Sequence, residues 1–377
     1  GGSPPTSMAA VANESGRSDR WKVVGGLGVV TAYTIAITYA VVVGWVLWYL
    51  GRALLTGFTD FDAAAAETTF AGLLADNQSM VIWTLIGNVI VGTIIYAGVT
   101  AGIERAVTIM MPLMFSLLVG LSVYNYFAGG FIETLQWLFT PDFSKVTGAT
   151  FLAAVGQAFF SIGVGMGGMM TYGAYLPKDF SIARGAGTIV LADTFIALLA
   201  GFVVFPAVFH FGLNMASGPG LIFQTLPVAF SQMPGGAVFA VLFFVMLALA
   251  GVTSMVGLLE SVTSWTKEKL GTTRQRSTIL VVGSVTCLSV ISVLSYNTWE
   301  DYRLLGMNFN ELTEALYDKL FLPMAGLLVA LFTGWFMRPD HSADELRDDP
   351  LWHRPWRGLT RFVVVPAVAV ILITGLI

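Results

Sequence analysis

Nine stretches of apolar residues dominate this sequence, and each is long enough to cross a lipid bilayer as a helix. A bilayer core requires about 20 apolar residues per helix, and backbone within lipid must satisfy its own hydrogen bonds. The stretches are 24–50, 79–101, 107–127, 150–172, 187–212, 236–264, 277–296, 312–337 and 359–377. The sequence therefore predicts an all-α polytopic membrane protein with nine spans.

Composition excludes several other classes of protein. Only 11% of the residues are charged and 56% are hydrophobic, whereas soluble domains carry about 25% charged residues. A soluble enzyme and a disordered chain are both excluded, and the net charge of −4 gives no basis for nucleic-acid binding. The lone Cys287 cannot form an intrachain disulfide. Among the histidines, His210, His341 and His353, none pairs with a nucleophile in a span, so we expect no enzymatic activity.

The basic residues alternate from loop to loop. Most of the 19 lysines and arginines fall on the side of residue 1, and the exceptions are Arg52, Lys145, Arg303 and Lys319. Because cytoplasmic loops are rich in lysine and arginine, nine spans place residue 1 in the cytoplasm and the C-terminus outside. Residues 1–20 lack the apolar core of a signal peptide. They form either a short cytoplasmic tail or an internal loop whose preceding helices are missing.

One span is interrupted by glycine. Residues 150–172 contain Gly163, Gly165, Gly167 and Gly168 near their middle. Each glycine inside a helix costs about 0.5–1 kcal/mol relative to alanine, so the cluster predicts an unwound segment at membrane depth. Such backbone is tolerated only when it is buried in protein or lines a wet cavity. The alternative is a small-residue face for close helix packing.

Two further spans carry polar groups at similar depth. Asp193 has no basic residue in its own span, and a carboxylate there costs about 2.5–3.5 kcal/mol unless it is paired or wet. A bound cation or a shared proton would satisfy it. In the segment AGVTS, the hydroxyls of Thr253 and Ser254 lie beside the carbonyl of Ala250, an oxygen set that suits a hard cation. The alternative is that both hydroxyls bond to their own helix.

Five segments in the same order resemble the neurotransmitter:sodium symporter family of leucine-transporter fold, and the resemblance covers nearly the whole chain. The resemblance implies a prokaryotic, sodium-coupled secondary active transporter of amino acids that works by alternating access. Its inverted repeats and discontinuous helices are a reference case for such transporters. The segments are GIERAVTIMMPLMF (102–115), FTPDFSKV (139–146), AAVGQAFFSIGVGMGGMMTYGAYLPKD (153–179), QTLPVAFSQMPGG (224–236) and AGVTS (250–254).

The resemblance also implies an organisation. The nine spans correspond to family helices three to eleven, so the first two are absent from this sequence. Residues 1–23 are then a cytoplasmic loop after helix two, 24–149 the rest of the first repeat and 150–337 the second repeat. Residues 338–377 form a cytoplasmic linker (338–358) and the last helix. We expect the 377 residues alone not to transport.

The ligand sites implied by the resemblance come from three spans. One sodium site uses Ser161 and Asp193, and a second uses Ala250, Thr253 and Ser254. Many relatives have asparagine at the Asp193 position, and its carboxylate would supply the charge that chloride supplies in some animal members. Chloride should therefore not be required. Both sites normally take further ligands from the first helix.

The implied amino-acid pocket consists of Ile35, Tyr39, Phe160, Ser161, Gly163, Met166, Gly167, Met255 and Leu258. Tyr39 would bond the substrate carboxylate and Phe160 would close over it, so both also act as gates; without the family, both would be ordinary lipid-facing or core aromatics. A bulky hydrophobic L-amino acid is expected. Tyr175 and Glu268 match the inner gate and Glu314 the outer gate, the alternative for both acids being a solvated charge.

Two rival functions are a truncated, non-transporting membrane protein and a proton-coupled amino-acid carrier that uses Asp193 as its relay. Glu260, deep in its span, should hydrogen-bond a neighbouring helix rather than bind substrate. The outer loop 51–78 has no cysteine pair, which argues against a typical animal member and favours a bacterial or archaeal cytoplasmic membrane. A homo-oligomer is compatible with the sequence.

Overall fold

The computed structural model describes residues 2–376 except 178–179, 214–217 and 347–349; Lys178 and Asp179, at the end of the segment 153–179, lie outside it. The regular elements of the described residues are all helices, and the only β-type pairing among them is one isolated bridge between Leu304 and Met307. Eight helical segments are long and apolar enough to cross a membrane: Asp19–Leu55, Asn77–Tyr96, Val99–Ala128, Ile182–His210, Gly236–Leu270, Arg274–Leu294, Phe309–Phe336 and His353–Gly375. The all-α membrane class is confirmed.

The ninth expected stretch, 150–172, is not one helix. It consists of α7 (Gly148–Ile162) and the short α8 (Gly168–Gly173), neither long enough to cross a bilayer alone. The nine apolar stretches therefore correspond, within the described residues, to eight continuous spans and one broken pair.

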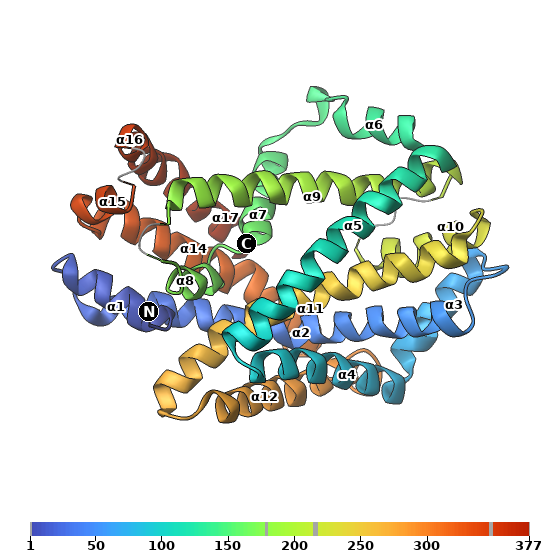
Figure 1. The fold of residues 1–377 in the computed structure, drawn as a ribbon, viewed down its shortest axis with the longest axis horizontal. Helices are drawn as coiled ribbons and strands as arrows, with labels where there is room; N and C mark the ends of the chain where they lie inside the picture. The colour runs from blue at the N-terminus through green and yellow to red at the C-terminus, as the bar shows by residue number, and fades with distance from the viewer. Residues whose placement is uncertain (1, 178–179, 214–217, 347–349, 377) are drawn as a thin grey trace.

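Two helices form the centre of the molecule. The 34-residue α2 (Lys22–Leu55) and the 35-residue α11 (Gly236–Leu270) pack along each other, as Figure 1 shows, with α4 (Asn77–Tyr96) and α12 (Arg274–Leu294) beside them. In the C-terminal half of α2, Trp45 makes an edge contact with Phe70, on α3 (Ala63–Ala75), at 5.5 Å between ring centroids. Burial of such large aromatic rings contributes strongly to the stability of a core.

The other spans surround this centre. The pair α5 (Arg105–Ala128) and α9 (Ile182–His210) pack together on one side. The remaining elements are η2 (Val99–Glu104), α6 (Phe131–Phe139), η3 (Phe143–Lys145), η4 (Leu221–Thr225), α10 (Leu226–Gln232), α13 (Phe309–Ala315), η5 (Leu316–Phe321), α14 (Leu322–Leu331), η6 (Phe332–Phe336), η7 (Thr360–Val364) and α17 (Val365–Leu376).

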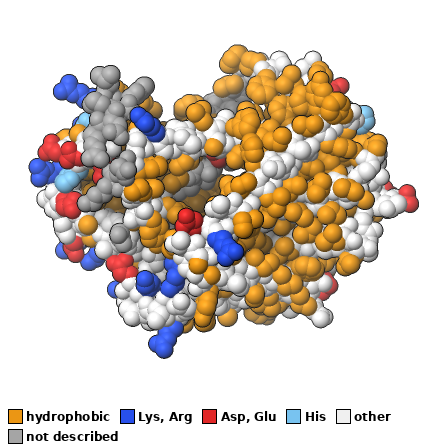
Figure 2. All heavy atoms as spheres, viewed as in Figure 1, with side chains coloured by type: hydrophobic (Ala, Val, Ile, Leu, Met, Phe, Trp, Pro, Cys, Tyr) orange, Lys and Arg blue, Asp and Glu red, His pale blue; other side chains and the backbone are white. Residues whose placement is uncertain are grey.

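The surface matches a membrane environment. In the view of Figure 2, apolar side chains cover the right half of the face, while lysine and arginine side chains gather on the left, where α1 lies in Figure 1. Phe127 and Leu191 are examples of large apolar side chains that are exposed on α5 and α9. Large exposed apolar surfaces are rare on soluble proteins and mark contact with lipid or a partner.

Two segments expected to be loops contain helices. Residues Pro4–Glu14 form α1 within the predicted loop 1–23, and η1 (Asp19–Trp21) follows it. Met8 and Ala12, one helical turn apart, are buried against Phe332, which explains why this mostly polar segment is ordered. In the expected linker 338–358, the structure has α15 (Pro339–Glu345) and most of α16 (Pro350–Leu359).

Candidate functional site

The break between α7 and α8 is built from three glycines with positive φ. Gly163 (φ 75°) ends α7, Gly165 (φ 89°) lies between the helices, and Gly167 (φ 72°) precedes the first residue of α8. Only glycine adopts these backbone conformations without steric cost. The predicted unwinding of this span is confirmed.

The unwound segment is held by backbone contacts on two sides. A Cβ atom on Gly28 of α2 would lie 3.0 Å from the Gly167 nitrogen, and one on Gly165 would lie 2.9 Å from the Leu322 carbonyl oxygen at the start of α14. Close packing and unwinding therefore occur together, although they were alternatives from the sequence. Gly167 is buried and residues 163–166 are half-buried, so the irregular backbone lies largely against protein, which an unwound segment at membrane depth requires.

A cavity of about 420 Å³ borders the break. Its walls come from α2, α7, α8 and α11 and from the glycine segment between α7 and α8. Seven of the residues assigned to the amino-acid pocket line it: Ile35, Tyr39, Phe160, Ser161, Gly163, Met166 and Leu258. The other lining residues are Gln157, Ile162, Gly168, Met169, Tyr172, Ser254 and Gly257. Tyr172 was not predicted to line the pocket. Its position within the broken-helix motif, residues 153–179, could have indicated it.

Two residues assigned to the pocket lie elsewhere. Gly167 is buried against Gly28, and Met255 is only 1% exposed within the main hydrophobic core. The spacing of α11 explains the second case, because Ser254 and Leu258 are four residues apart and share one face. Met255 is turned about 100° from Ser254 around the helix axis, toward the core.

Ser161 and Asp193 connect the broken span to α9. The Ser161 hydroxyl lies 2.7 Å from Oδ1 and 2.8 Å from Oδ2 of Asp193 and can donate to either. Within the described residues, none of the ion pairs includes Asp193, and no group of three His, Cys, Asp or Glu side chains forms a metal site. Ser161 lines the cavity and Asp193 does not, so the pair places a hydroxyl at the cavity and a carboxylate beside that hydroxyl. Both are oxygen ligands that suit Na⁺.

The AGVTS segment lies in the middle of α11. The Thr253 hydroxyl is 3.0 Å from the carbonyl oxygens of both Leu249 and Ala250, as the back-bonded alternative expects. A hydroxyl that donates to a carbonyl keeps lone pairs for a cation, so this bond leaves the oxygen usable as a ligand. Ser254 lines the cavity from the same helix.

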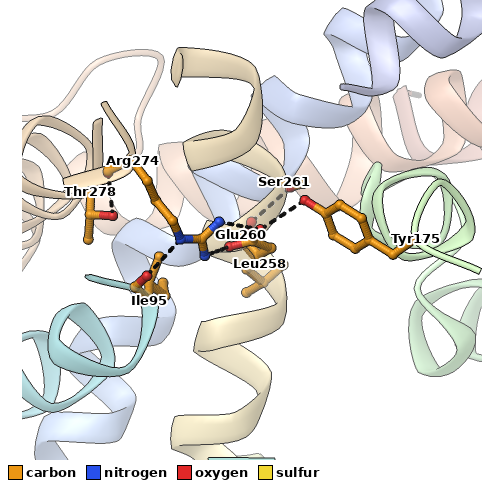
Figure 3. Close-up of polar contacts among 7 residues, drawn as sticks. All are labelled: Ile95, Tyr175, Leu258, Glu260, Ser261, Arg274 and Thr278. Carbon is orange, nitrogen blue, oxygen red and sulfur yellow. Dashed lines mark hydrogen bonds and ion pairs between the residues drawn. The ribbon is translucent and has the colours of Figure 1, made fainter. Parts of the chain in front are cut away.

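A buried ion pair lies on α11 two residues beyond Leu258, which lines the cavity (Figure 3). Glu260 is 0% exposed and accepts hydrogen bonds from Arg274 Nη1 at 3.0 Å and Nη2 at 2.5 Å. Tyr175, just after α8, donates to the same carboxylate at 3.2 Å, and Arg274 Nε donates to the Ile95 carbonyl at 2.9 Å. The network ties the segment after α8 to α4, α11 and α12, and it confirms that Glu260 bonds neighbouring elements.

The two acids assigned to gates lie on different helices and have different partners. Glu268, at the end of α11, accepts a bond from the Ser3 amide at 2.8 Å and one from the Thr6 hydroxyl, which joins it to α1. Glu314, on α13, accepts a bond from Asn310 at 3.0 Å. It lines a second cavity, of about 840 Å³, together with Phe160.

The profile of the Sodium:neurotransmitter symporter family matches residues 72–372, well over half of the chain. The chain belongs to this family. Its relatives include an "Uncharacterized sodium-dependent transporter" of Haemophilus influenzae, 30% identical and aligned with 96% of this chain and 80% of the relative. The sodium-dependent transporter YhdH of Bacillus subtilis is also 30% identical, with 97% and 82% of the two chains aligned.

The fold is similar to a solved structure of the same kind. MhsT, crystallised in complex with L-phenylalanine, superposes with a TM-score of 0.85 at 32% identity, covering 94% of this chain and 81% of MhsT. The family and the leucine-transporter fold that the motifs predicted are both confirmed. The protein is therefore a multi-pass membrane protein of a sodium-dependent transporter family.

Proposed function

We propose that this protein is a symporter that couples the inward movement of a hydrophobic L-amino acid to the sodium gradient. The observation that carries the proposal is the cavity at the α7–α8 break, which is lined by unwound backbone, Tyr39 and Ser161, and the Ser161 hydroxyl in turn donates to Asp193. The two solutes move between compartments without covalent change, so the activity is transport rather than enzymatic catalysis.

Coupling follows from the shared space. Asp193 and Ser161 would hold one sodium ion beside the cavity, and Ala250, Thr253 and Ser254 would hold a second. The substrate carboxylate would accept a bond from Tyr39 and add an oxygen to the first sodium ion. Because each solute then completes the other's site, binding of one raises the affinity for the other, and the coupling is reciprocal. The fixed charge of Asp193 makes chloride unnecessary.

The walls of the cavity favour a large apolar side chain. Ile35, Phe160, Met166 and Leu258 supply the apolar surface, and methionine adapts its shape to different ligands. The glycine at position 163 leaves room beside them. The comparison with MhsT supports the same substrate class, since that relative is seen with L-phenylalanine.

Alternating access would use the contacts on the inner and outer sides of the amino-acid cavity. Glu268, with its bonds to α1, and Tyr175, with its bond to Glu260, are the groups that would separate when the inner side opens. Phe160 and Glu314 would do so on the outer side. The protein would lie in the cytoplasmic membrane, with residue 1 inside and the C-terminus outside, as the distribution of basic residues predicts.

Uptake of labelled L-phenylalanine into proteoliposomes tests the proposal, with the intact protein and an inward gradient of Na⁺ or K⁺ at fixed pH. We expect uptake only with Na⁺, insensitive to replacement of chloride by gluconate, and competed by leucine or tryptophan but not by glycine. Tyr39→Phe should weaken uptake, whereas Tyr33→Phe, on the same helix outside the cavity, should not.

Three results of this experiment would contradict the proposal. Uptake driven by a proton gradient without sodium would make Asp193 a proton relay. Absence of both uptake and sodium-dependent binding for any amino acid would indicate a non-transporting membrane protein. A strict chloride requirement would refute the role given to the Asp193 charge.

A further inference from the structure

A third cavity, which is basic and has a volume of about 500 Å³, lies where the last span begins, between α15, α16 and η7. We call it the α16 cavity. Its chemistry comes from His353, Arg354, Arg357 and Arg361, together with Asp340 and Phe362. The Asp340 carboxylate is already paired with Arg338, at 3.2 Å. The cavity therefore carries an excess of positive charge.

Arg357 is the buried member of this set. Its residue is only 7% exposed, Nη1 donates to the Ser342 hydroxyl at 3.2 Å and Nη2 donates to the Met337 carbonyl at 2.6 Å. Its Nε atom is buried and has no hydrogen-bond partner. Both partners are neutral, and in the part of the chain described here no ion pair includes Arg357. A buried charge is costly unless an opposite charge pairs with it, and among the described residues no carboxylate pairs with this guanidinium.

Three further basic side chains surround Arg357. Arg361 donates from Nε to the Gly334 carbonyl, and its guanidinium lies 5.4 Å from the centroid of the Trp335 ring. His353 Nε2 lies 2.8 Å from the same Ser342 hydroxyl that Arg357 contacts. Arg354 is exposed at the rim of the cavity. A guanidinium matches the geometry of phosphate oxygens and can bind two of them at once.

The edge of the cavity is apolar. Phe362 is 69% exposed, and Leu359 and Trp335 are also exposed. The helix α16 is amphipathic, and this pattern of aromatic and basic side chains beside the start of a span is typical of the membrane interface. Basic pockets next to spans on the cytoplasmic side are known to bind lipid head groups. A soluble anion would use the arginines, whereas a lipid would use the apolar edge as well.

We propose that the α16 cavity binds the phosphate of an anionic phospholipid, with its acyl chains along Leu359 and Phe362. The phosphate oxygens accept bonds from Arg354, Arg357 and Arg361 and supply the charge that the buried guanidinium lacks. The bound lipid holds α15 and the beginning of α16 against the membrane surface. This site is separate from the amino-acid cavity and does not depend on the transport activity.

Lipid binding to the purified intact protein tests the proposal. Phosphatidylglycerol, phosphatidylcholine and inorganic phosphate are each titrated into the delipidated protein in detergent, and bound molecules are counted by native mass spectrometry. We expect phosphatidylglycerol to bind at least about tenfold more tightly than phosphatidylcholine. Arg354→Gln/Arg361→Gln should weaken it about tenfold or more, because hydrogen bonds to charged groups are lost.

A matched control separates the site from general charge effects. Arg105→Gln/Arg276→Gln removes the same charge from two exposed arginines on the same predicted cytoplasmic side, and it should change binding less than about twofold. The single variant Arg354→Gln, at an exposed residue, provides a test that leaves the fold intact. Equal loss in the control and cavity variants, or no preference for phosphatidylglycerol, would overturn the proposal. So would arginine-dependent binding of inorganic phosphate without that of phosphatidylglycerol, which would make the ligand a free anion.

Discussion

Asp193 and Glu260 are both carboxylates on membrane-spanning helices, and their surroundings differ. Glu260 is fully buried and receives bonds from two nitrogens of Arg274 and from Tyr175. Asp193 is half-buried beside the amino-acid cavity and receives its bonds from one neutral hydroxyl, that of Ser161. The chain itself satisfies the first charge, whereas no ion pair among the described residues includes the second, which is the charge that we propose to bind sodium. A charge satisfied internally stabilises one conformation, and a charge left open binds a ligand.

The first way to test this contrast is to remove the cation from the internal pair. Arg274→Met leaves the Glu260 carboxylate buried without a counter-charge, and we expect the free energy of unfolding to fall by about 3–5 kcal/mol. Thermal unfolding in detergent measures the loss. Glu260→Met/Arg274→Met removes both charges and should recover much of the stability. A single variant as stable as the parent would show that the pair does not hold these helices together.

The second test addresses the unwound backbone beside Ser161, the partner of Asp193. Gly165→Ala forces a side chain into φ 89° and places its Cβ 2.9 Å from the Leu322 carbonyl, so we expect a loss of about 1–3 kcal/mol in the free energy of unfolding. Gly168→Ala is the matched control, because a Cβ there meets nothing within 4 Å and its φ is not positive. Equal effects in the two variants would contradict the role of the break.

The third test exchanges the open charge. Asp193→Asn keeps the shape of the side chain and should change the unfolding temperature little, since no internal cation pairs with this carboxylate. The sodium concentration for half-maximal binding of L-phenylalanine should rise about tenfold, as expected for loss of a charged ligand worth about 1.4 kcal/mol. Scintillation proximity binding measures it. A large loss of stability with unchanged sodium dependence would reverse the contrast with Glu260.

The fourth test separates the tyrosine from the ion pair. Tyr175→Phe removes the hydroxyl that donates to Glu260 at 3.2 Å and that also bonds Ser264, and the Arg274 bonds remain. We expect the free energy of unfolding to fall by about 1 kcal/mol. The rate of amino-acid uptake should change more than the affinity if this bond breaks as the inner side opens. A loss as large as that of Arg274→Met would mean that the hydroxyl, rather than the guanidinium, satisfies the carboxylate.

The smallest effect is expected for a carboxylate in water. Asp76 begins α4 outside the spans, and the hydrogen bond from the Ser79 hydroxyl lowers the pKa of its carboxyl. Its stabilisation is therefore present above the ordinary pKa of about 3.9 and is lost as the pH falls through the lower folded value. Asp76→Ala should cost about 0.5–1 kcal/mol at pH 7 and less below pH 3. Unfolding temperatures across this range measure it; the same cost at both pH values would contradict the assignment.

Glycine clustering predicted the α7–α8 break because positive φ is a local property of the backbone. The pairing of Ser161 with Asp193 was also within reach, since two polar groups at membrane depth have few other partners. The partner of Glu260 was not, because Arg274 follows a loop and resembles an ordinary solvated charge in the sequence. Its burial depends on the end of α4, where Ile95 offers a carbonyl. Met255 packs in the core rather than lining the cavity, and the motif alone does not tell which face of α11 borders the cavity.

The contact between Gly28 and Gly167 joins two helical elements through backbone alone. Because no side chains interlock at this contact, a small displacement of α8 relative to α2 would not require side chains to repack. A larger residue at either position would push the two elements apart. The short helix α8 could then no longer move in contact with α2, the helix that also carries Tyr39.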